Sequence, residues 1–355
     1  MKTTLFAGLT IALLSTSGTA LAQQIPQVPV QPAECVAGGN NCSVVTQSGS
    51  NGSATTDQTG SGNTATVEQT TIVGGDSQID QSGSFNFASV SQTDDGVMLD
   101  IQESAIDQIG DRNIAFVFQD ENGGSEGQDS TINQSGSDNY AEVSQVGFAD
   151  NSSIVQSSDF NLAFVSQGSP NSSGVIIGDN QFSTINQSDA GGHRAEVNQP
   201  EGTFNNSNIG QAGASNSAFV TQRGSTGDSD IIQIGIMNTA TTTQSISDSF
   251  NSFNDRAFVE QVGNMNTSNV AQDLGDGKRV VVTQAGDMGQ STITQTGDGH
   301  LATLDQLLGG TGNISEIIQS GTTHTAAVRQ GGVSNFSNVN QSGTGNVATV
   351  DQNVP

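Results

Sequence analysis

Residues 335–352 read NFSNVNQSGTGNVATVDQ, and this stretch decides the fold because its pattern returns along most of the chain. It holds two segments that close on Gln341 and Gln352, each with small or apolar residues two and four places before the glutamine. An alternation with a period of two is typical of a β-strand. A short connection containing Gly343 joins the segments, as in a tight turn. The stretch therefore predicts a strand, a turn and a second strand.

Glutamines that close such segments occur 26 times from Gln47 to Gln352, mostly 11 or 12 residues apart. One segment type reads Asn-x-Ala-x-Val-x-Gln, as in residues 139–145, and the other reads Ser-x-Ile-x-Gln, as in residues 130–134. The distance from the glutamine of a Ser-type segment to the glutamine of the next Asn-type segment is always 11 or 12 residues, whereas the distance from an Asn type to the next Ser type reaches 20 residues. A degraded or skipped strand is expected in residues 244–261. Insertions confined to one edge are typical of stacked repeats. We therefore expect an all-β, cross-β, two-sheet solenoid of about 13 strand-turn-strand rungs.

The chain divides into three segments. Residues 1–22 carry a basic residue, an apolar run and a small-x-small pattern, which predict a cleaved signal peptide and a secreted product. Residues 23–41 contain three of the six prolines and predict a flexible leader. Residues 42–355 contain the repeats. No run approaches the roughly 20 apolar residues of a membrane helix, so we expect no membrane insertion.

Charge and composition disfavour several function classes. The formal charge of −27 would repel nucleic acids and anionic lipid, so we expect no nucleic-acid partner. Acidic residues form no recurring pair, and neither HExxH nor a Cys/His cluster is present, so we expect no enzyme, cofactor or metal site. Calcium binding by acidic loops such as residues 94–96 is a minor alternative to solvated loops. His193, His300 and His324 stand where other repeats have asparagine, and we interpret them as substituted ladder positions, with metal binding as the minor alternative.

Recurring amides explain how the expected rungs are held together. A buried amide without partners costs about 1–3 kcal/mol, but identical amides stacked one rung apart can hydrogen-bond in continuous ladders. A ladder is satisfied everywhere except at its ends, and an unpaired strand edge is a template for another copy. We therefore expect end-to-end polymerisation into a homopolymer fibre. The expected ladder residues are Gln47, Gln58, Gln69, Gln81, Gln92, Gln119, Gln145, Gln167, Gln222, Gln341, Gln352, Asn63, Asn86, Asn113, Asn139, Asn161, Asn216 and Asn346.

Cysteines and phenylalanines add two further expectations. Cys35 and Cys42 lie at the junction of leader and repeats, where export favours a disulfide over a free or intermolecular pair. The absence of CxxC argues against redox catalysis. Four phenylalanines, expected to face outward, form either an apolar stripe that packs surfaces together or isolated exposed aromatics. These are Phe116, Phe164, Phe219 and Phe258.

The repeat Ser/Asn-x(5)-Gln-x-Gly-x-x-Asn-x-Ala-x(3)-Gln, which covers about residues 42–352, resembles the curlin family of bacterial curli subunits. The resemblance implies a functional amyloid fibre at the cell surface, with roles in biofilm matrix and cell adhesion. It also implies export through a curli-type outer-membrane pore, with a targeting signal in residues 23–41, and nucleation by a minor subunit. The alternatives are that this chain is the nucleator, or a monomeric secreted β-solenoid adhesin or ice-binding module.

Overall fold

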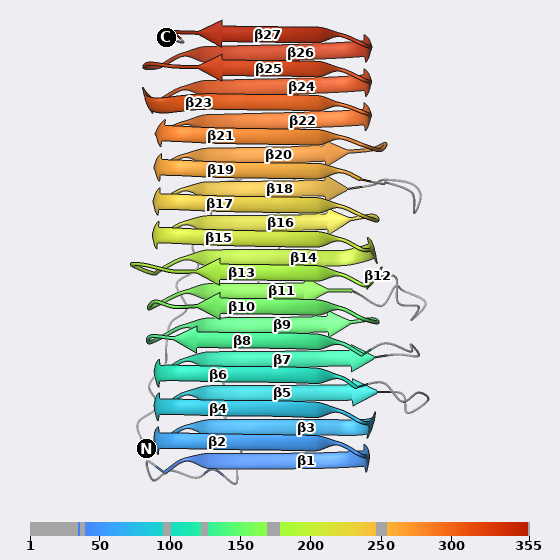
Figure 1. Ribbon diagram of the computed structural model, residues 1–355, viewed down its shortest axis with the longest axis vertical. Coiled ribbons are helices and arrows are strands. Elements are labelled where there is room, and N and C mark those ends of the chain that lie inside the picture. The colour runs from blue at the N-terminus through green and yellow to red at the C-terminus, as the bar shows by residue number, and fades with distance from the viewer. Residues whose placement is uncertain are drawn as a thin grey trace, which may run out of the picture.

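The computed structural model describes Cys35 and residues 40–94, 101–121, 127–168, 178–245 and 254–353. These residues form a column of short strands that lie across its long axis, with the first and last strands at opposite ends (Figure 1). The predicted signal peptide and all of the predicted leader except Cys35 and residues 40–41 lie outside the described residues.

Strands alternate along the chain between two parallel sheets. The first sheet contains β1 (Cys42–Ser50), β3 (Thr64–Val73), β5 (Phe87–Asp94), β7 (Ile114–Glu121), β9 (Tyr140–Val146), β11 (Leu162–Gln167), β14 (Arg194–Thr203), β16 (Ser217–Arg223), β18 (Thr239–Ser245), β20 (Thr267–Asp273), β22 (Gln290–Asp298), β24 (Ile314–Thr322) and β26 (Phe336–Thr344), with the short β12 (Gly178–Asp179) paired to β14. The second sheet contains β2 (Ser53–Ser61), β4 (Asp76–Ser84), β6 (Glu103–Asp111), β8 (Asp129–Ser135), β10 (Asn151–Gln156), β13 (Phe182–Gln187), β15 (Asn206–Ala214), β17 (Asp228–Ile236), β19 (Arg256–Asn264), β21 (Arg279–Asp287), β23 (Leu301–Thr311), β25 (Thr325–Gln330) and β27 (Val347–Gln352). The second sheet has 13 strands, so the column has 13 rungs of two strands each, as the sequence predicts.

Neighbouring strands keep one register, set by the closing glutamine. Gln145 of β9 lies beside Gln119 of β7 on one side and Gln167 of β11 on the other. Because side chains alternate between faces, a shared register places the same side of every strand inward. The period of 11 or 12 residues is therefore the length of one strand with its turn.

The order of strand types changes between β2 and β3, which carry Ala54 and Ala65, and it changes again between β18 and β19. Both β18 and β19 carry the alanine pattern, with Ala240 and Ala257 at the same place, although they lie in different sheets. Consequently the alanine type occupies the first sheet from β3 to β18 and the second sheet from β19 to β27, where β21 has Val280 in place of alanine. The sequence predicts a degraded or skipped strand in residues 244–261. A strand of the serine type is indeed missing there from the alternation of types. No strand is missing from either sheet, because β17 pairs directly with β19 and β18 with β20.

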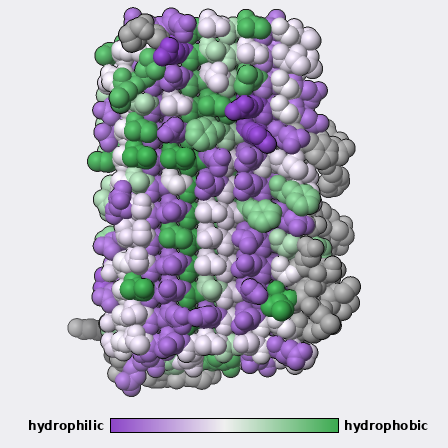
Figure 2. All heavy atoms as spheres, in the orientation of Figure 1, coloured by the Kyte–Doolittle hydropathy of each residue, from purple (hydrophilic) through white to green (hydrophobic). Residues whose placement is uncertain are grey.

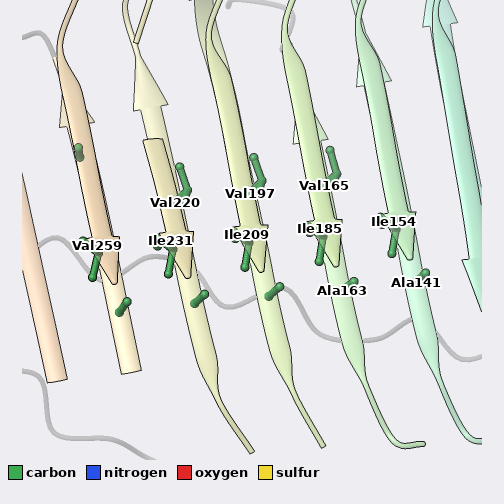
Figure 3. Packing of buried hydrophobic residues seen from close by; sticks show 14 of the residues in the cluster. Ala141, Ile154, Ala163, Val165, Ile185, Val197, Ile209, Val220, Ile231 and Val259 are labelled. Carbon is green, nitrogen blue, oxygen red and sulfur yellow. The ribbon is translucent and has the colours of Figure 1, made fainter. Parts of the chain in front are cut away.

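Inward apolar side chains form a thin core between the sheets. Ile185, Ile209 and Ile231 lie in one row of the second sheet, one per strand, and are fully buried (Figure 3). Val197 and Val220 form the corresponding row of the first sheet. Burial of each such side chain stabilises the fold by roughly 1.5–3 kcal/mol. A single strand cannot bury this face alone, so the stacked rungs depend on one another.

Turn glycines stack along one edge of the column. Gly213, Gly235 and Gly263 have φ of +100°, +123° and +122°, in the region that favours glycine. A Cβ on Gly235 would lie 1.9 Å from the carbonyl oxygen of Gly263. Both the backbone conformation and this close approach explain why glycine recurs two places after the ladder glutamine.

Candidate functional site

An unbroken row of glutamine side chains runs along each sheet. Each Nε2 donates to the Oε1 of the next glutamine in its sheet. The first bond of the first sheet joins Gln47 to Gln69 at 2.6 Å, and the last bond of the second sheet joins Gln330 to Gln352 at 2.8 Å. Nε2 also donates to a backbone carbonyl of the opposite sheet, as from Gln233 to Ser217 O at 3.0 Å. The glutamines therefore join rung to rung and sheet to sheet.

All the predicted glutamines lie in these two ladders. In the first sheet they are Gln47, Gln69, Gln92, Gln119, Gln145, Gln167, Gln222 and Gln341. In the second sheet they are Gln58, Gln81 and Gln352.

A second ladder lies six places before the glutamines, where most strands of the first sheet begin. The backbone N–H of Asn113 donates to Oδ1 of Asn86 at 2.9 Å, and the N–H of Asn86 donates to Oδ1 of Asn63 at 3.0 Å. Nδ2 of Asn113 donates to the carbonyl of Gly136 in the neighbouring turn at 2.9 Å. The predicted asparagines of the first sheet are Asn63, Asn86, Asn113, Asn139, Asn161 and Asn216, and Asn346 lies at the same place in the second sheet.

Three histidines take this asparagine place, as predicted. Nδ1 of His300 accepts the backbone N–H of His324 at 3.2 Å, and Nδ1 of His193 accepts that of Asn216 at 3.2 Å. Because Nδ1 faces an N–H donor, the proton lies on Nε2, which donates to Thr296 O at 3.0 Å in His300. Burial lowers the pKa of His193 and His300 below the usual histidine value, which favours this neutral form.

A buried ion pair occupies this asparagine place at the starts of β19 and β21 in the second sheet. Lys278 Nζ lies 3.0 Å from Asp255 Oδ2, and both side chains are almost completely buried. The backbone N–H of Lys278 donates to Asp255 Oδ1 at 2.9 Å, as an asparagine ladder would. Nζ also donates to Leu274 O at 3.0 Å. Nothing in the repeat pattern singles out these two residues, and they were not predicted.

Outward side chains form vertical rows, because the register is shared by all strands (Figure 2). One row of the second sheet places Asp57, Asp80 and Asp107 on successive strands. Burial, together with the charge of Asp80, raises the pKa of Asp107. At the other end of this row, Arg329 lies between Asp305 and Asp351, with Nε 3.6 Å from Asp305 Oδ2.

The predicted phenylalanines do not lie on one surface. Phe116, Phe164 and Phe219 belong to the first sheet, but Phe258 belongs to the second. Phe164 is fully buried, so the expectation of exposed aromatics is wrong for it. Tyr140 stands two places earlier in its strand, and its ring packs diagonally between two of these phenylalanines, with its centroid 5.9 Å from that of Phe116 and 5.4 Å from that of Phe164.

Arg194 of β14 extends this aromatic cluster, although its register partner in β11 is Leu162. Its guanidinium lies 5.1 Å from the ring centroid of Phe164 and 5.8 Å from that of Phe219. The first sheet therefore carries an aromatic cluster that includes Tyr140 and a cation, and the spacing of the phenylalanines alone did not predict these two members.

Strand edges at both ends of the column are unpaired among the described residues, since β1 and β2 lead the two sheets and β26 and β27 close them. Val45 of β1 is 43% exposed, whereas Val67, at the same place in β3, is 2% exposed. Gln47 is exposed, and Gln58 and Gln352 are half-buried, unlike the buried glutamines between them. The ends therefore present core and ladder groups that every inner rung covers.

Cys35 and Cys42 form a disulfide, with their Cα atoms 5.6 Å apart. Within the described ranges, no helix is long and apolar enough to cross a membrane. The described residues also contain no group of three or more His, Cys, Asp or Glu side chains placed to hold a metal ion. Loop residues 95–96 of the calcium alternative lie outside them. No protein-family model matches the sequence, and no curated protein matches it.

Proposed function

We propose that this protein is an extracellular structural subunit that adds to copies of itself, end to end, to form a cross-β fibre. The observation that carries this proposal is the pair of unbroken glutamine ladders, which run through all 13 rungs and stop only where the strands stop. A further copy in the same register would continue the backbone pairing, the core and both ladders at once.

The resemblance of the repeat to curlin sequences supports a wider role. By that resemblance the fibre belongs to the curli-like functional amyloids of biofilm matrix and surface adhesion. Export through a curli-type outer-membrane pore and contact with a nucleator subunit are part of the same proposal. The alternatives are the nucleator itself and a monomeric β-solenoid adhesin or ice-binding module.

Backbone geometry at β27 offers a sharp test. Thr325 N–H in β25 donates to Asn346 O, one rung further along, at 2.9 Å. Val347 has the same place in β27, so its N–H points toward the next rung, and its side chain is 75% exposed. Proline at Val347 would remove this outward donor without breaking a bond inside the column, because proline is tolerated where a strand begins or its N–H faces solvent.

The experiment releases the protein from denaturant into dilute buffer and follows thioflavin fluorescence and electron micrographs. We expect fibres from the wild type and from Val347→Ala, which keeps the N–H, and much slower growth from Val347→Pro. Equal circular dichroism of the three monomers controls for folding. A wild type that keeps its full β signal as a monomer would overturn the proposal and favour the adhesin. Equal growth of the alanine and proline variants would show that this edge does not accept strands.

A further inference from the structure

The ladders give the two ends of the column different chemistry. Every ladder bond runs from Nε2 of one glutamine to Oε1 of the glutamine further along the chain, as from Gln319 to Gln341 at 2.9 Å. The β26–β27 end therefore presents glutamine N–H groups, and the β1–β2 end presents glutamine oxygens. If copies add end to end, as proposed above, the complementary contact is β1 of one copy on β26 of another, with β2 on β27.

Matching the glutamines fixes every other row of this contact. Gln47 would lie on Gln341 and Gln58 on Gln352, which is the register found at each inner rung. In the second sheet this brings Ala54 onto Ala348 and Thr55 onto Thr349, and in the first sheet Val45 onto Val339. These pairs are alike in size and polarity, so they favour the contact.

One row is mismatched, because both of its end residues are acidic. Asp57 of β2 and Asp351 of β27 are exposed and stand one place before their glutamines, so the matched register places them directly beside each other. Neighbouring strands lie about 4.8 Å apart, and like charges directly opposite destabilise strand pairing. The contact would thus create a new pair of adjacent carboxylates.

We propose that the carboxylates of Asp57 and Asp351, from two different copies, form an electrostatic gate that slows end-to-end addition when both are ionised and releases it on acidification. This inference rests on the proposed function and names the residues that regulate it. Repulsion makes the joined state bind a proton more tightly than the separate copies do. Linkage then requires that addition become more favourable as the pH falls.

The groups around this pair leave the repulsion only partly compensated. Beside Asp351, Arg329 is the one cation of the row, and it already lies 3.6 Å from Asp305. Beside Asp57 stands Asp80, which accepts a 2.7 Å hydrogen bond from its neighbour Gln78. Asp107 follows Asp80, so four carboxylates would stand in succession across the contact. The raised pKa of Asp107 indicates that burial and charge already penalise ionisation within this row.

The test measures elongation of fibre seeds by soluble protein of the same sequence, at pH 7 and at steps down to pH 4. Two unit charges about 4.8 Å apart in a water-like dielectric repel enough to slow addition about fourfold. We therefore expect Asp351→Asn to elongate its own seeds about fourfold faster than wild type at pH 7, with the ratio falling toward one near pH 4. Glu260→Gln is the matched control, because this substitution removes the same charge. Glu260 stands at the same place in β19, one residue before the ladder glutamine, and lies far from both ends of the column.

A double-mutant cycle tests the pairing itself. Asp57→Asn alone should accelerate growth as Asp351→Asn does, and the double variant should gain little more, because either change removes the same repulsion. Fibres that form but grow at wild-type rates in both Asn variants, or that respond equally to Glu260→Gln, would overturn the gate and leave end-to-end assembly standing. Failure of every variant and of the wild type to form fibres would overturn the proposed function as well.

Discussion

Replacing one ladder glutamine in the middle of the column should destabilise the fold far more than replacing an outward glutamine. Gln233 is fully buried in β17 and accepts a 2.8 Å hydrogen bond from Nε2 of Gln211. It donates to Oε1 of Gln261 at 2.8 Å and to Ser217 O at 3.0 Å. Leucine at this position has a similar size but no polar group. Gln233→Leu therefore leaves an N–H of Gln211 and the Oε1 of Gln261 buried without that partner.

The magnitude follows from these two groups. A buried polar group left without its partner costs about 1–3 kcal/mol, so Gln233→Leu should lower the free energy of unfolding by about 2–6 kcal/mol. Gln78 is the matched control, because it lies on the outward face of β4 and donates only to Asp80. We expect Gln78→Leu to change stability by about 0.5 kcal/mol or less.

Urea unfolding of freshly refolded monomer, followed by circular dichroism, measures both variants. Because repeat columns can unfold in parts, the slopes of the transitions must agree before midpoints are compared. If Gln233→Leu shifted the midpoint no more than Gln78→Leu, the ladders would not contribute the stability that we assign to them.

Three further substitutions test other parts of the structure. Gly235→Ala should lower the free energy of unfolding in urea by about 1–3 kcal/mol, because the φ of Gly235 is positive and a Cβ there would meet backbone atoms. Gly210→Ala, at a position with open space around it, should leave stability unchanged, and equal effects of the two substitutions would contradict the turn geometry. His300 has a lowered pKa, so the unfolded chain takes up a proton first as the pH falls below about 6.5, and stability present above that pH is lost. His300→Asn keeps the ladder acceptor and should lose less stability between pH 7.5 and pH 5 than wild type; an unchanged pH profile of the urea midpoint would refute this. Lys278→Met should cost about 3–5 kcal/mol by leaving Asp255 buried without its cation, and a loss below 1 kcal/mol in thermal unfolding would show that the pair is not needed.

The sequence predicts the architecture because one residue sets the register of every strand. A glutamine at the end of each segment, with inward residues at fixed places before it, allows only one alignment of neighbouring strands. Gln145 therefore lies beside Gln119 and Gln167, as the period requires. The ladder role of His193, His300 and His324 follows from the same counting, since imidazole Nδ1 can accept the hydrogen bond that Asn Oδ1 accepts.

Features that depend on neighbours in space were not predictable by counting. Lys278 and Asp255 are 23 residues apart, and only the pairing of β19 with β21 brings them together. Phe164 was expected to be exposed because its place faces outward, yet it packs against Tyr140 and Arg194 from the adjacent strands. Similarly, the order of strand types changes after β18 because both types fit either sheet. The repeat constrains the register, but it does not determine which sheet holds which type.

The axial repeat of the assembled fibre is the most direct test of the central claim. If copies add end to end in register, each contributes 13 rungs about 4.8 Å apart, or roughly 62 Å along the axis. Electron cryomicroscopy of fibres, with diffraction from oriented samples, would then show strong order near 4.8 Å together with a subunit repeat near 62 Å. Monomers that retain full β structure without fibres, or fibres whose subunit repeat is far from this value, would contradict the account.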